Sequence, residues 1–252
     1  MRWTLPRLAN RLVGNSEEAA VLETTMLGCT VRCSDSRVVA VTGALCDVRV
    51  EGRAVDWGLP LHLPAGARLQ IGQATRGVRS YLALSGGIEV QPVLGSRSTD
   101  LLSGLGPPRL SIGDTIPLGC AQRAPAAVDI ALPPPVAEQI LVRLRLGPRD
   151  DWLSHESLRM LAGEPYEVST DSDRVGLRLR GIALQRTRDD ELPSEGIVLG
   201  AVQVPSDGQP LVFLADHPTT GGYPVVAVVE GADLPLLAQA RPGTTLRFSE
   251  VS

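Results

Sequence analysis

Residues 194–230, SEGIVLGAVQVPSDGQPLVFLADHPTTGGYPVVAVVE, decide the class of fold. They contain three apolar, β-branched runs, at Ile197–Val204, Pro210–Ala215 and Pro224–Val229. Turns rich in Gly, Pro, Asp and Ser separate the runs. Short apolar runs bounded by such turn residues are typical of strands in a buried antiparallel sheet. The stretch therefore predicts a mainly β fold.

The turn between the second and third runs, DHPTTGGY (216–223), carries more polar chemistry than a hairpin needs. Asp216 or His217 could act as a general base, because either can accept a proton from water. Hydroxyl and backbone N–H groups that could bind an oxyanion or phosphate come from Thr219, Thr220, Gly221 and Gly222, and Tyr223 is a further substrate-binding candidate. The alternative is a rigid turn fixed by Gly and Pro.

The composition excludes several functions. With a net charge of −4 and only 3% aromatic residues, the chain lacks the basic and stacking surfaces that bind nucleic acid. All 24 basic residues are Arg, so the chain has neither a Schiff-base lysine nor a P-loop lysine. No apolar run reaches the ~18 residues of a membrane span, and no signal segment opens the chain. We expect a cytoplasmic protein without a membrane partner.

Cysteine and histidine spacing gives no metal signature. The four cysteines, Cys29, Cys33, Cys46 and Cys120, form no CxxC motif, and the three histidines lie far apart in the sequence. We therefore expect reduced, buried thiols and no zinc site.

An Ala/Pro-rich segment, AQRAPAAVDIALPPP (121–135), predicts the domain boundary, because consecutive prolines form a stiff connector. Short strand-like runs at regular spacing before it predict one β-barrel domain over residues 1–122. The same pattern restarts after it and predicts a second barrel domain over residues 136–252.

Individual elements are also predicted. Helices are expected over Leu5–Val13 and over Asp150–Leu161, the latter with Asp150 or Asp151 as its N-cap. Gly43 is expected to end a strand that begins at Ser36. Other strands are expected at Arg68–Gly72, Ser80–Leu84 and, as a closing strand, Leu110–Leu118.

A second polar group lies in PVLGSRSTD (92–100). Arg97 with the flanking Ser98 and Thr99 would place one guanidinium beside hydroxyls and so bind an anion. The alternative is a loop whose hydroxyls cap its own backbone.

A third group lies in SDRVGLRLRG (172–181). Asp173 is a candidate catalytic acid, and Arg174 is a candidate ligand of a phosphate or carboxylate. The alternative is a structural Asp–Arg pair that ties a loop. Gln203 could donate its amide to a lactam or ureido group, or it could be an ordinary buried amide of the sheet. No GxSxG elbow supports a serine hydrolase.

In order and spacing, the motifs PVLGSRSTD, SDRVGLRLRG and SEGIVLGAVQVPSDGQP followed by DHPTTGGYP resemble one family. It is the carboxyltransferase-like family that includes KipA, the C-type subunit of 5-oxoprolinase and the second half of the urea carboxylase carboxyltransferase domain. Its members are also labelled allophanate hydrolase subunit 2. The resemblance covers nearly the whole chain and implies two cyclophilin-like β-barrel domains with a few short helices.

The resemblance implies three possible roles. The first is the C-type subunit of an ATP-dependent 5-oxoprolinase, an enzyme that opens 5-oxoproline to glutamate. Mg²⁺ would accompany ATP. The implied partners are a KipI-like B-type subunit and an A-type subunit. The second is biotin-dependent carboxyl transfer to a urea-like acceptor, with biotin carried on another protein. The third is a non-enzymatic KipA-like antagonist of a KipI-type kinase inhibitor.

The resemblance also implies a strand and a TxQDxGRxGxxxxGVxxSGxxD-like segment ahead of RLANRLVGN (7–15). Here Met1 falls just before that point. We expect either a start codon further upstream or a first barrel that lacks a strand.

Overall fold

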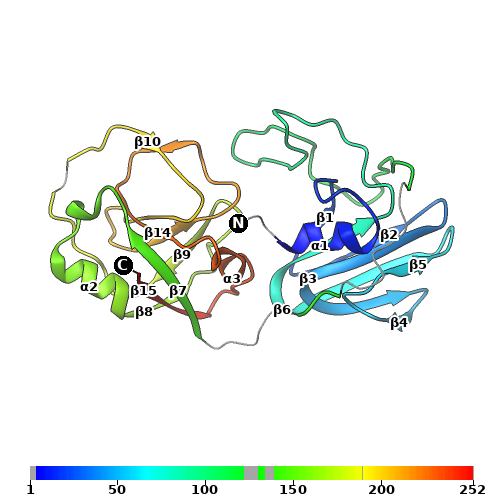
Figure 1. Ribbon diagram of the computed structural model, residues 1–252, viewed down its shortest axis with the longest axis horizontal. Helices are drawn as coiled ribbons and strands as arrows, with labels where there is room; N and C mark the ends of the chain where they lie inside the picture. Colours follow the sequence, from blue (N-terminus) through cyan, green and yellow to red (C-terminus); the bar gives the residue numbers. More distant parts are fainter. Residues whose placement is uncertain (1–3, 122–129, 134–138, 189, 252) are drawn as a thin grey trace. The chain divides into compact units, whose positions relative to one another are not determined.

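The computed structural model describes residues 4–121, 130–133, 139–188 and 190–251 (Figure 1). The chain divides between Pro135 and Val136 into two compact units, called here the N-terminal and C-terminal units. Both consist mainly of strands, with one described helix in the N-terminal unit and a few short helices in the C-terminal unit, which confirms the predicted mainly β fold class. Likeness to cyclophilin stays a prediction.

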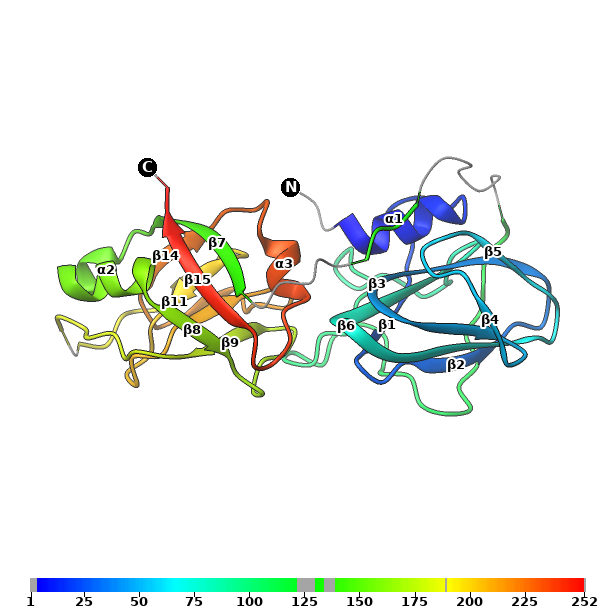
Figure 2. The same cartoon turned by 90° about the horizontal axis from the view of Figure 1, so that it is seen from below.

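The N-terminal unit is built on two long antiparallel strands. Its helix and strands are α1 (Thr4–Leu12), β1 (Leu22–Thr25), β2 (Cys29–Arg32), β3 (Arg37–Val50), β4 (Arg53–Val55), β5 (Leu61–Leu63) and β6 (Arg68–Leu84). β3 pairs with β6 along most of its length, β1 and β2 add to β6, and β4 and β5 add to β3. Helix α1, predicted from its apolar spacing, packs Ala9 and Leu12 against Ala40 and Ala83 of this sheet (Figure 2).

The prediction that Gly43 ends a strand is wrong, because β3 continues to Val50. Gly43 has a φ of +89°, and a Cβ there would lie 2.3 Å from the carbonyl oxygen of Arg79. The register with β6 shifts between Gly43 and Leu45. Gly43 therefore forms a β-bulge, which bends a strand without ending it.

Two further strand predictions are corrected. Residues 68–84 form one strand, β6, although two were predicted there. The predicted closing strand Leu110–Leu118 is absent, since within it only Leu118 forms an isolated bridge, with Ile88. The four cysteines are unpaired as predicted, but Cys120 is exposed.

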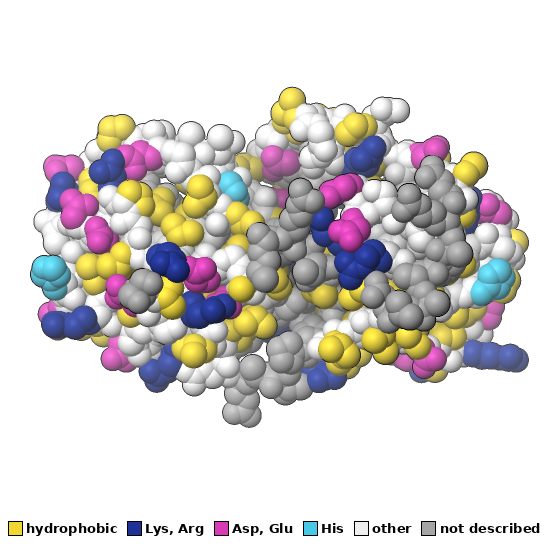
Figure 3. All heavy atoms as spheres, in the orientation of Figure 1, with side chains coloured by type: hydrophobic (Ala, Val, Ile, Leu, Met, Phe, Trp, Pro, Cys, Tyr) yellow, Lys and Arg dark blue, Asp and Glu magenta, His cyan; other side chains and the backbone are white. Residues whose placement is uncertain are grey.

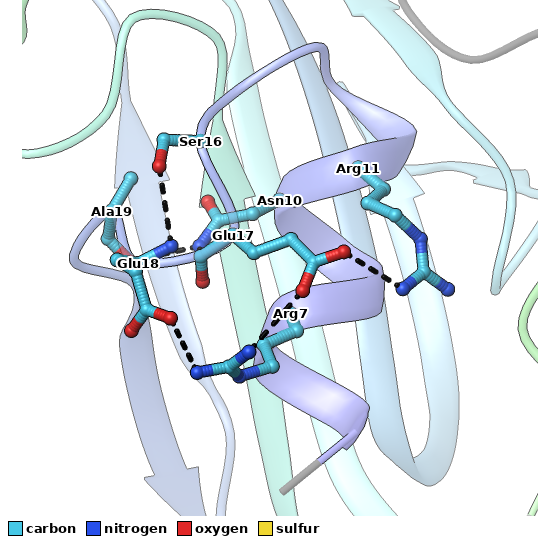
Figure 4. A network of polar contacts seen from close by, with 7 residues as sticks. All are labelled: Arg7, Asn10, Arg11, Ser16, Glu17, Glu18 and Ala19. Carbon is cyan, nitrogen blue, oxygen red and sulfur yellow. Dashed lines mark hydrogen bonds and ion pairs between the residues drawn. The ribbon is translucent and has the colours of Figure 1, made fainter. Parts of the chain in front are cut away.

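A buried polar network fixes the segment that follows α1 (Figure 4). The fully buried Asn10 donates its side-chain amide to the carbonyl oxygens of Ala19, at 2.8 Å, and Glu17, at 3.4 Å. Arg7 forms ion pairs with Glu17 and Glu18 on the surface above it. Because buried amides are costly unless hydrogen-bonded, this network fixes residues 17–19 against α1.

The C-terminal unit is a closed barrel. Its elements are β7 (Gln139–Leu146), the 3₁₀ helix η1 (Asp150–Trp152), α2 (His155–Gly163), β8 (Pro165–Val168), β9 (Gly176–Arg180), β10 (Glu195–Gly196), β11 (Ala201–Gln203), β12 (Leu211–Phe213), β13 (Thr220–Gly221), β14 (Val225–Val229), α3 (Leu234–Ala238) and β15 (Thr245–Glu250). The barrel order is β11-β12-β9-β8-β15-β7-β14. The three predicted runs supply β11, β12 and β14, which pair antiparallel as predicted. β15 pairs with β7 in parallel.

The predicted long helix is two elements. Residues 150–152 form η1, Leu153 is extended, and α2 begins only at His155. Ser154 is the N-cap, and its hydroxyl accepts the backbone N–H of Ser157 at 3.1 Å. The prediction of an aspartate N-cap is therefore wrong, because the side chain of Ser154 satisfies a free N–H in the first turn of α2.

Candidate functional site

The turn predicted as a site lies on a small flap outside the barrel (Figure 1). β10 and β13 pair only with each other in the described chain, with Glu195 opposite Gly221 and Gly196 opposite Thr220. We call residues 195–196 and 216–223 the flap. One further hydrogen bond, of 3.0 Å from the N–H of Ile197 to the carbonyl oxygen of Thr219, continues the pairing of the two flap strands.

Arg174 and Asp216 form a two-point ion pair at the start of the flap. Arg174 Nε lies 2.9 Å from Asp216 Oδ2, and Nη2 lies 3.3 Å from Oδ1. The backbone N–H of Asp216 also donates to the carbonyl oxygen of Arg174 at 3.1 Å. With the Asp216 side chain only 12% exposed, the guanidinium orients this carboxylate and contacts both of its oxygens.

Asp173 shapes the turn that leads into β9. Its Oδ1 accepts the backbone N–H groups of Val175 at 2.8 Å and Gly176 at 3.0 Å. Its carboxylate thus caps this turn. The sequence left open a structural Asp–Arg pair in this motif, and the structure pairs Arg174 with the distant Asp216.

His217 is half-buried in the turn, and the contacts of its ring indicate which nitrogen carries the proton. Its Nδ1 lies 2.8 Å from the carbonyl oxygen of Pro218, and its ring meets Phe213 edge-on at 6.5 Å between centroids. Because a carbonyl oxygen only accepts, this contact assigns the proton to Nδ1. Nε2 of the neutral ring then carries the lone pair that can accept a proton.

The donor groups of the turn face solvent. Thr219, Thr220, Gly222 and Tyr223 are exposed. Gly221 is half-buried, and a Cβ there would lie 2.6 Å from Ile197 Cδ1, so the Ile197 side chain would have to shift to admit it. These donors lie on the same segment as Asp216 and His217, and Arg174 is joined to that segment by its ion pair with Asp216.

Gln203, the last residue of β11, is hydrogen-bonded to the end of the turn. Its side chain is buried, and its Nε2 donates to the carbonyl oxygen of Tyr223 at 2.7 Å. This is the buried-amide alternative that the sequence left open, with one addition: the amide holds the end of the turn against β11.

Sequence reasoning missed the contact that anchors the flap. Arg149, in the loop after β7, donates from Nε to Glu195 Oε2 at 3.1 Å and forms a second contact through Nη2. The backbone N–H of Arg149 donates to the carbonyl oxygen of Val225 at 3.2 Å, so the arginine is itself fixed to β14. A hydrogen bond from Arg149 lowers the pKa of Glu195 below its ordinary value of 4.5, although desolvation opposes the shift.

The Arg149–Glu195 contact should make the flap sensitive to acid. Since the folded-state pKa of Glu195 is lowered, its stabilisation is present above pH 4.5 and is lost as the pH falls through the folded value. In hydrogen exchange, protection of the Ile197 amide should fall below pH 4.5 in the wild type and be low at every pH in Glu195→Gln. Asp171→Asn, which removes the exposed ion pair with Arg180 in the same unit, serves as control. Wild-type protection in Glu195→Gln would contradict the anchoring role.

The Arg97 group lies in the N-terminal unit. Arg97 Nε donates to the carbonyl oxygen of Val90 at 3.1 Å, and Thr99 Oγ1 donates to that of Pro107 at 2.8 Å. The backbone N–H of Ser98 donates to Ser96 Oγ at 3.1 Å. The loop therefore caps its own backbone, while Arg97 also lines a surface cavity of about 600 Å³. Anion binding by Arg97, Ser98 and Thr99 stays a prediction.

The described residues contain no group of three His, Cys, Asp or Glu side chains arranged to hold a metal ion. None of their helices has the length and apolarity to span a membrane.

Comparison with known proteins gives concordant matches. Residues 3–250 match the family described as carboxyltransferase domain, subdomain A and B. The chain is 40% identical to the C-type subunit of 5-oxoprolinase from Escherichia coli (strain K12), over 98% of this chain and 80% of that protein.

Two solved structures extend this likeness. The crystal structure of TTHA0988 matches with a TM-score of 0.85 and 39% identity, over 98% of this chain and 48% of that one. The crystal structure of the Kluyveromyces lactis urea amidolyase matches with a TM-score of 0.88 and 29% identity, over 98% of this chain and 16% of that one. This chain thus spans about half the length of the first solved relative.

The mainly β fold, together with these matches, assigns the chain to the carboxyltransferase class of β proteins. The chain belongs to the carboxyltransferase domain, subdomain A and B, family. The family resemblance inferred from the three sequence motifs is confirmed.

Proposed function

We propose that the chain is the C-type subunit of a cytoplasmic, ATP-dependent 5-oxoprolinase that opens 5-oxoproline to L-glutamate. The observation that carries the proposal is the 40% identity to the corresponding E. coli 5-oxoprolinase polypeptide over 98% of the chain. Two other polypeptides complete the enzyme: a KipI-like B-type subunit and an A-type subunit. The chain alone is inactive, because its exposed flap needs these partners to enclose the reaction.

ATP is the cosubstrate of the proposed reaction. Its terminal phosphoryl group is transferred to the lactam carbonyl oxygen, and a first water adds to the carbonyl carbon. The ring C–N bond then breaks, and the nitrogen takes up a proton to become the amine of glutamate. A second water hydrolyses the resulting acyl phosphate, which releases phosphate and the new carboxylate.

The flap residues have separate roles in this scheme. Nε2 of His217 accepts the proton of an attacking water. Backbone N–H and hydroxyl groups at Thr219, Thr220 and Gly222 stabilise the negative charge that develops on oxygen. Asp216 is held by Arg174 and positions the turn, so His217 is the base that the geometry favours over Asp216. Mg²⁺ would accompany ATP in this scheme, and the described residues contain no group of three His, Cys, Asp or Glu side chains that could hold a metal ion.

Glutamate release tests the proposal. The chain is coexpressed with the A-type and B-type subunits of its own organism, and glutamate is measured with 5-oxoproline and ATP. Release that requires all three polypeptides is the expected result, with preparations lacking each of them in turn as controls. A purified three-subunit complex that releases no glutamate would overturn the proposed function.

The urea amidolyase match favours one second candidate, biotin-dependent carboxyl transfer to a urea-like acceptor. Biotin would arrive on a separate carrier protein, since this chain contains no lysine for its attachment. Carboxylation of urea by this chain with a carboxybiotinylated carrier, in a preparation that releases no glutamate from 5-oxoproline, would select this function. The KipA-like antagonist role stays a prediction.

A further inference from the structure

The N-terminal unit has a surface cavity of about 600 Å³, which shares Ser16, Glu18 and Ala19 with the network of Figure 4. Its lining comes from three places in the chain: the segment after α1 (between residues 16 and 20), the segment after β6 (residues 86–92) and Arg97. Small-molecule sites in proteins have volumes of roughly 300–1,000 Å³. The cavity is therefore large enough for a ligand of the size of an amino acid.

Hydrogen bonds join the two segments that line most of the cavity. Asn15, which precedes the first segment, donates from Nδ2 to the carbonyl oxygen of Leu84 at 2.8 Å and accepts the N–H of Gly86 on Oδ1 at 2.9 Å. Further along, Ala20 forms an antiparallel bridge with Ile88. The walls are thus held together before a ligand binds, which reduces the entropy lost on binding.

Arg97 brings a positive charge to the cavity without a carboxylate partner. Elsewhere in this unit Arg7, Arg37 and Arg79 are each paired with a carboxylate, and Figure 3 shows basic side chains (dark blue) next to acidic ones (magenta) in several places. Arg97 Nε donates to the carbonyl oxygen of Val90 at 3.1 Å, and no carboxylate among the described residues forms an ion pair with this guanidinium. Within that part of the chain, its two terminal nitrogens are available for the two oxygens of a ligand carboxylate.

The same lining offers a hydrogen-bond acceptor and a hydrogen-bond donor. Glu89 and Gln91 both line the cavity and are exposed, and neither side chain forms a hydrogen bond or ion pair with another described residue. A carboxylate only accepts hydrogen bonds, whereas a carboxamide can donate two. Apolar lining between these groups comes from Ile88, Val90 and Pro92. A matching ligand carries a carboxylate, an N–H group, a carbonyl oxygen and a few methylene groups.

We propose that this cavity binds 5-oxoproline, a small lactam carboxylate. The ligand carboxylate pairs with Arg97, the lactam N–H donates to Glu89, and the lactam carbonyl oxygen accepts from Gln91. The inference rests on the proposed function, which names this substrate but assigns no group that holds its carboxylate. A nucleoside triphosphate fits less well, because the charged lining residues are one arginine and two glutamates, and the glutamates repel a polyphosphate.

The test is a calorimetric titration of the full chain with 5-oxoproline, without ATP and without other subunits. Arg97→Gln removes the guanidinium from an exposed position, so folding should be unaffected. We expect its Kd to rise about tenfold or more, because a two-point contact between charged groups is lost. The matched control Arg109→Gln changes another exposed arginine of the same unit, which does not line the cavity, and should leave the Kd unchanged.

A second variant, Glu89→Gln, tests the contact to the lactam nitrogen. We expect the Kd for 5-oxoproline to rise about fivefold, since the hydrogen bond loses its charged acceptor. The lactone analogue, in which a ring oxygen replaces the N–H group, should show the opposite change. The Glu89 carboxylate repels this ring oxygen, whereas the amide of the variant can donate to it. A purely structural effect of the substitution would weaken both ligands equally.

The remaining outcomes separate this site from its rivals and from the proposed function. Failure of the wild type to bind 5-oxoproline would overturn the site, as would equal Kd values for the wild type and Arg97→Gln. Tighter binding of L-glutamate than of 5-oxoproline would overturn the lactam as the ligand. Binding of 5-oxoproline through Arg97, together with a three-subunit complex that releases no glutamate, would contradict the proposed function alone.

Discussion

Replacing His217 with asparagine is expected to slow glutamate release by the assembled complex about a hundredfold or more, which is the usual loss when a general base is removed. The amide nitrogen of asparagine lies near the position of imidazole Nδ1, so it can keep the hydrogen bond of 2.8 Å to Pro218. The substitution removes only Nε2, the nitrogen with the free lone pair. The rate is measured at saturating ATP and 5-oxoproline.

A control variant and a stability measurement distinguish a catalytic role of His217 from a structural one. His155→Asn, at the exposed first residue of α2, is the matched control and should leave the rate unchanged. His217→Asn should assemble with the A-type and B-type subunits and keep the thermal stability of the wild type. A rate within twofold of the wild type would remove His217 from the proposed mechanism, and Asp216 would then be the remaining candidate base.

The largest effect on stability is expected at the bulge in β3. Gly43→Ala should lower the free energy of unfolding by about 3 kcal/mol, within the range of severe single substitutions. The new Cβ would lie 2.3 Å from the Arg79 carbonyl oxygen and 2.9 Å from Tyr81 Cδ2, and both atoms belong to the paired strand β6. Tyr81 is buried, so its ring has no open space to move into.

Gly52→Ala separates the clash from the backbone strain. Gly52 has a similar φ of +80°, but no heavy atom lies within 4 Å of the position of its Cβ. This variant should lose only about 1 kcal/mol, the cost of the left-handed conformation. Urea denaturation of the full chain, followed by circular dichroism, measures both values. Equal losses in the two variants would show that packing against β6 is not what requires Gly43.

Local sequence patterns predicted the barrel strands, because a buried strand appears in the sequence as a short run of apolar residues. Each of the three apolar runs in residues 194–230 contains one barrel strand. The strands are shorter than the runs, and β11 begins only at Ala201, because Gly200 has a φ of +86°, outside the conformation of a strand. The flap strands were missed, since two residues such as Glu195 and Gly196 are too few to show an alternating pattern.

The pairings of the site could not be predicted from the sequence. Its motifs identified Arg174, Asp216 and His217 as individual candidates. The ion pair between the first two joins residues 42 positions apart, and the pair of Arg149 with Glu195 spans 46 positions. Such contacts depend on how the strands are ordered around the barrel. For the same reason, the sequence could not choose between the two interpretations of Gln203.

The strand order of the barrel has a consequence for synthesis of the protein. β15 is the last strand of the barrel in chain order, yet it lies between β7, the first, and β8. While the ribosome is still adding residues 245–250, β7 and β8 lack the neighbour that joins them. The C-terminal unit must therefore complete its fold after these residues have emerged, with edge strands open until then, whereas every described strand of the N-terminal unit has been made by residue 84. The interval before β15 emerges is when the nascent chain is most exposed to mispairing and to chaperones.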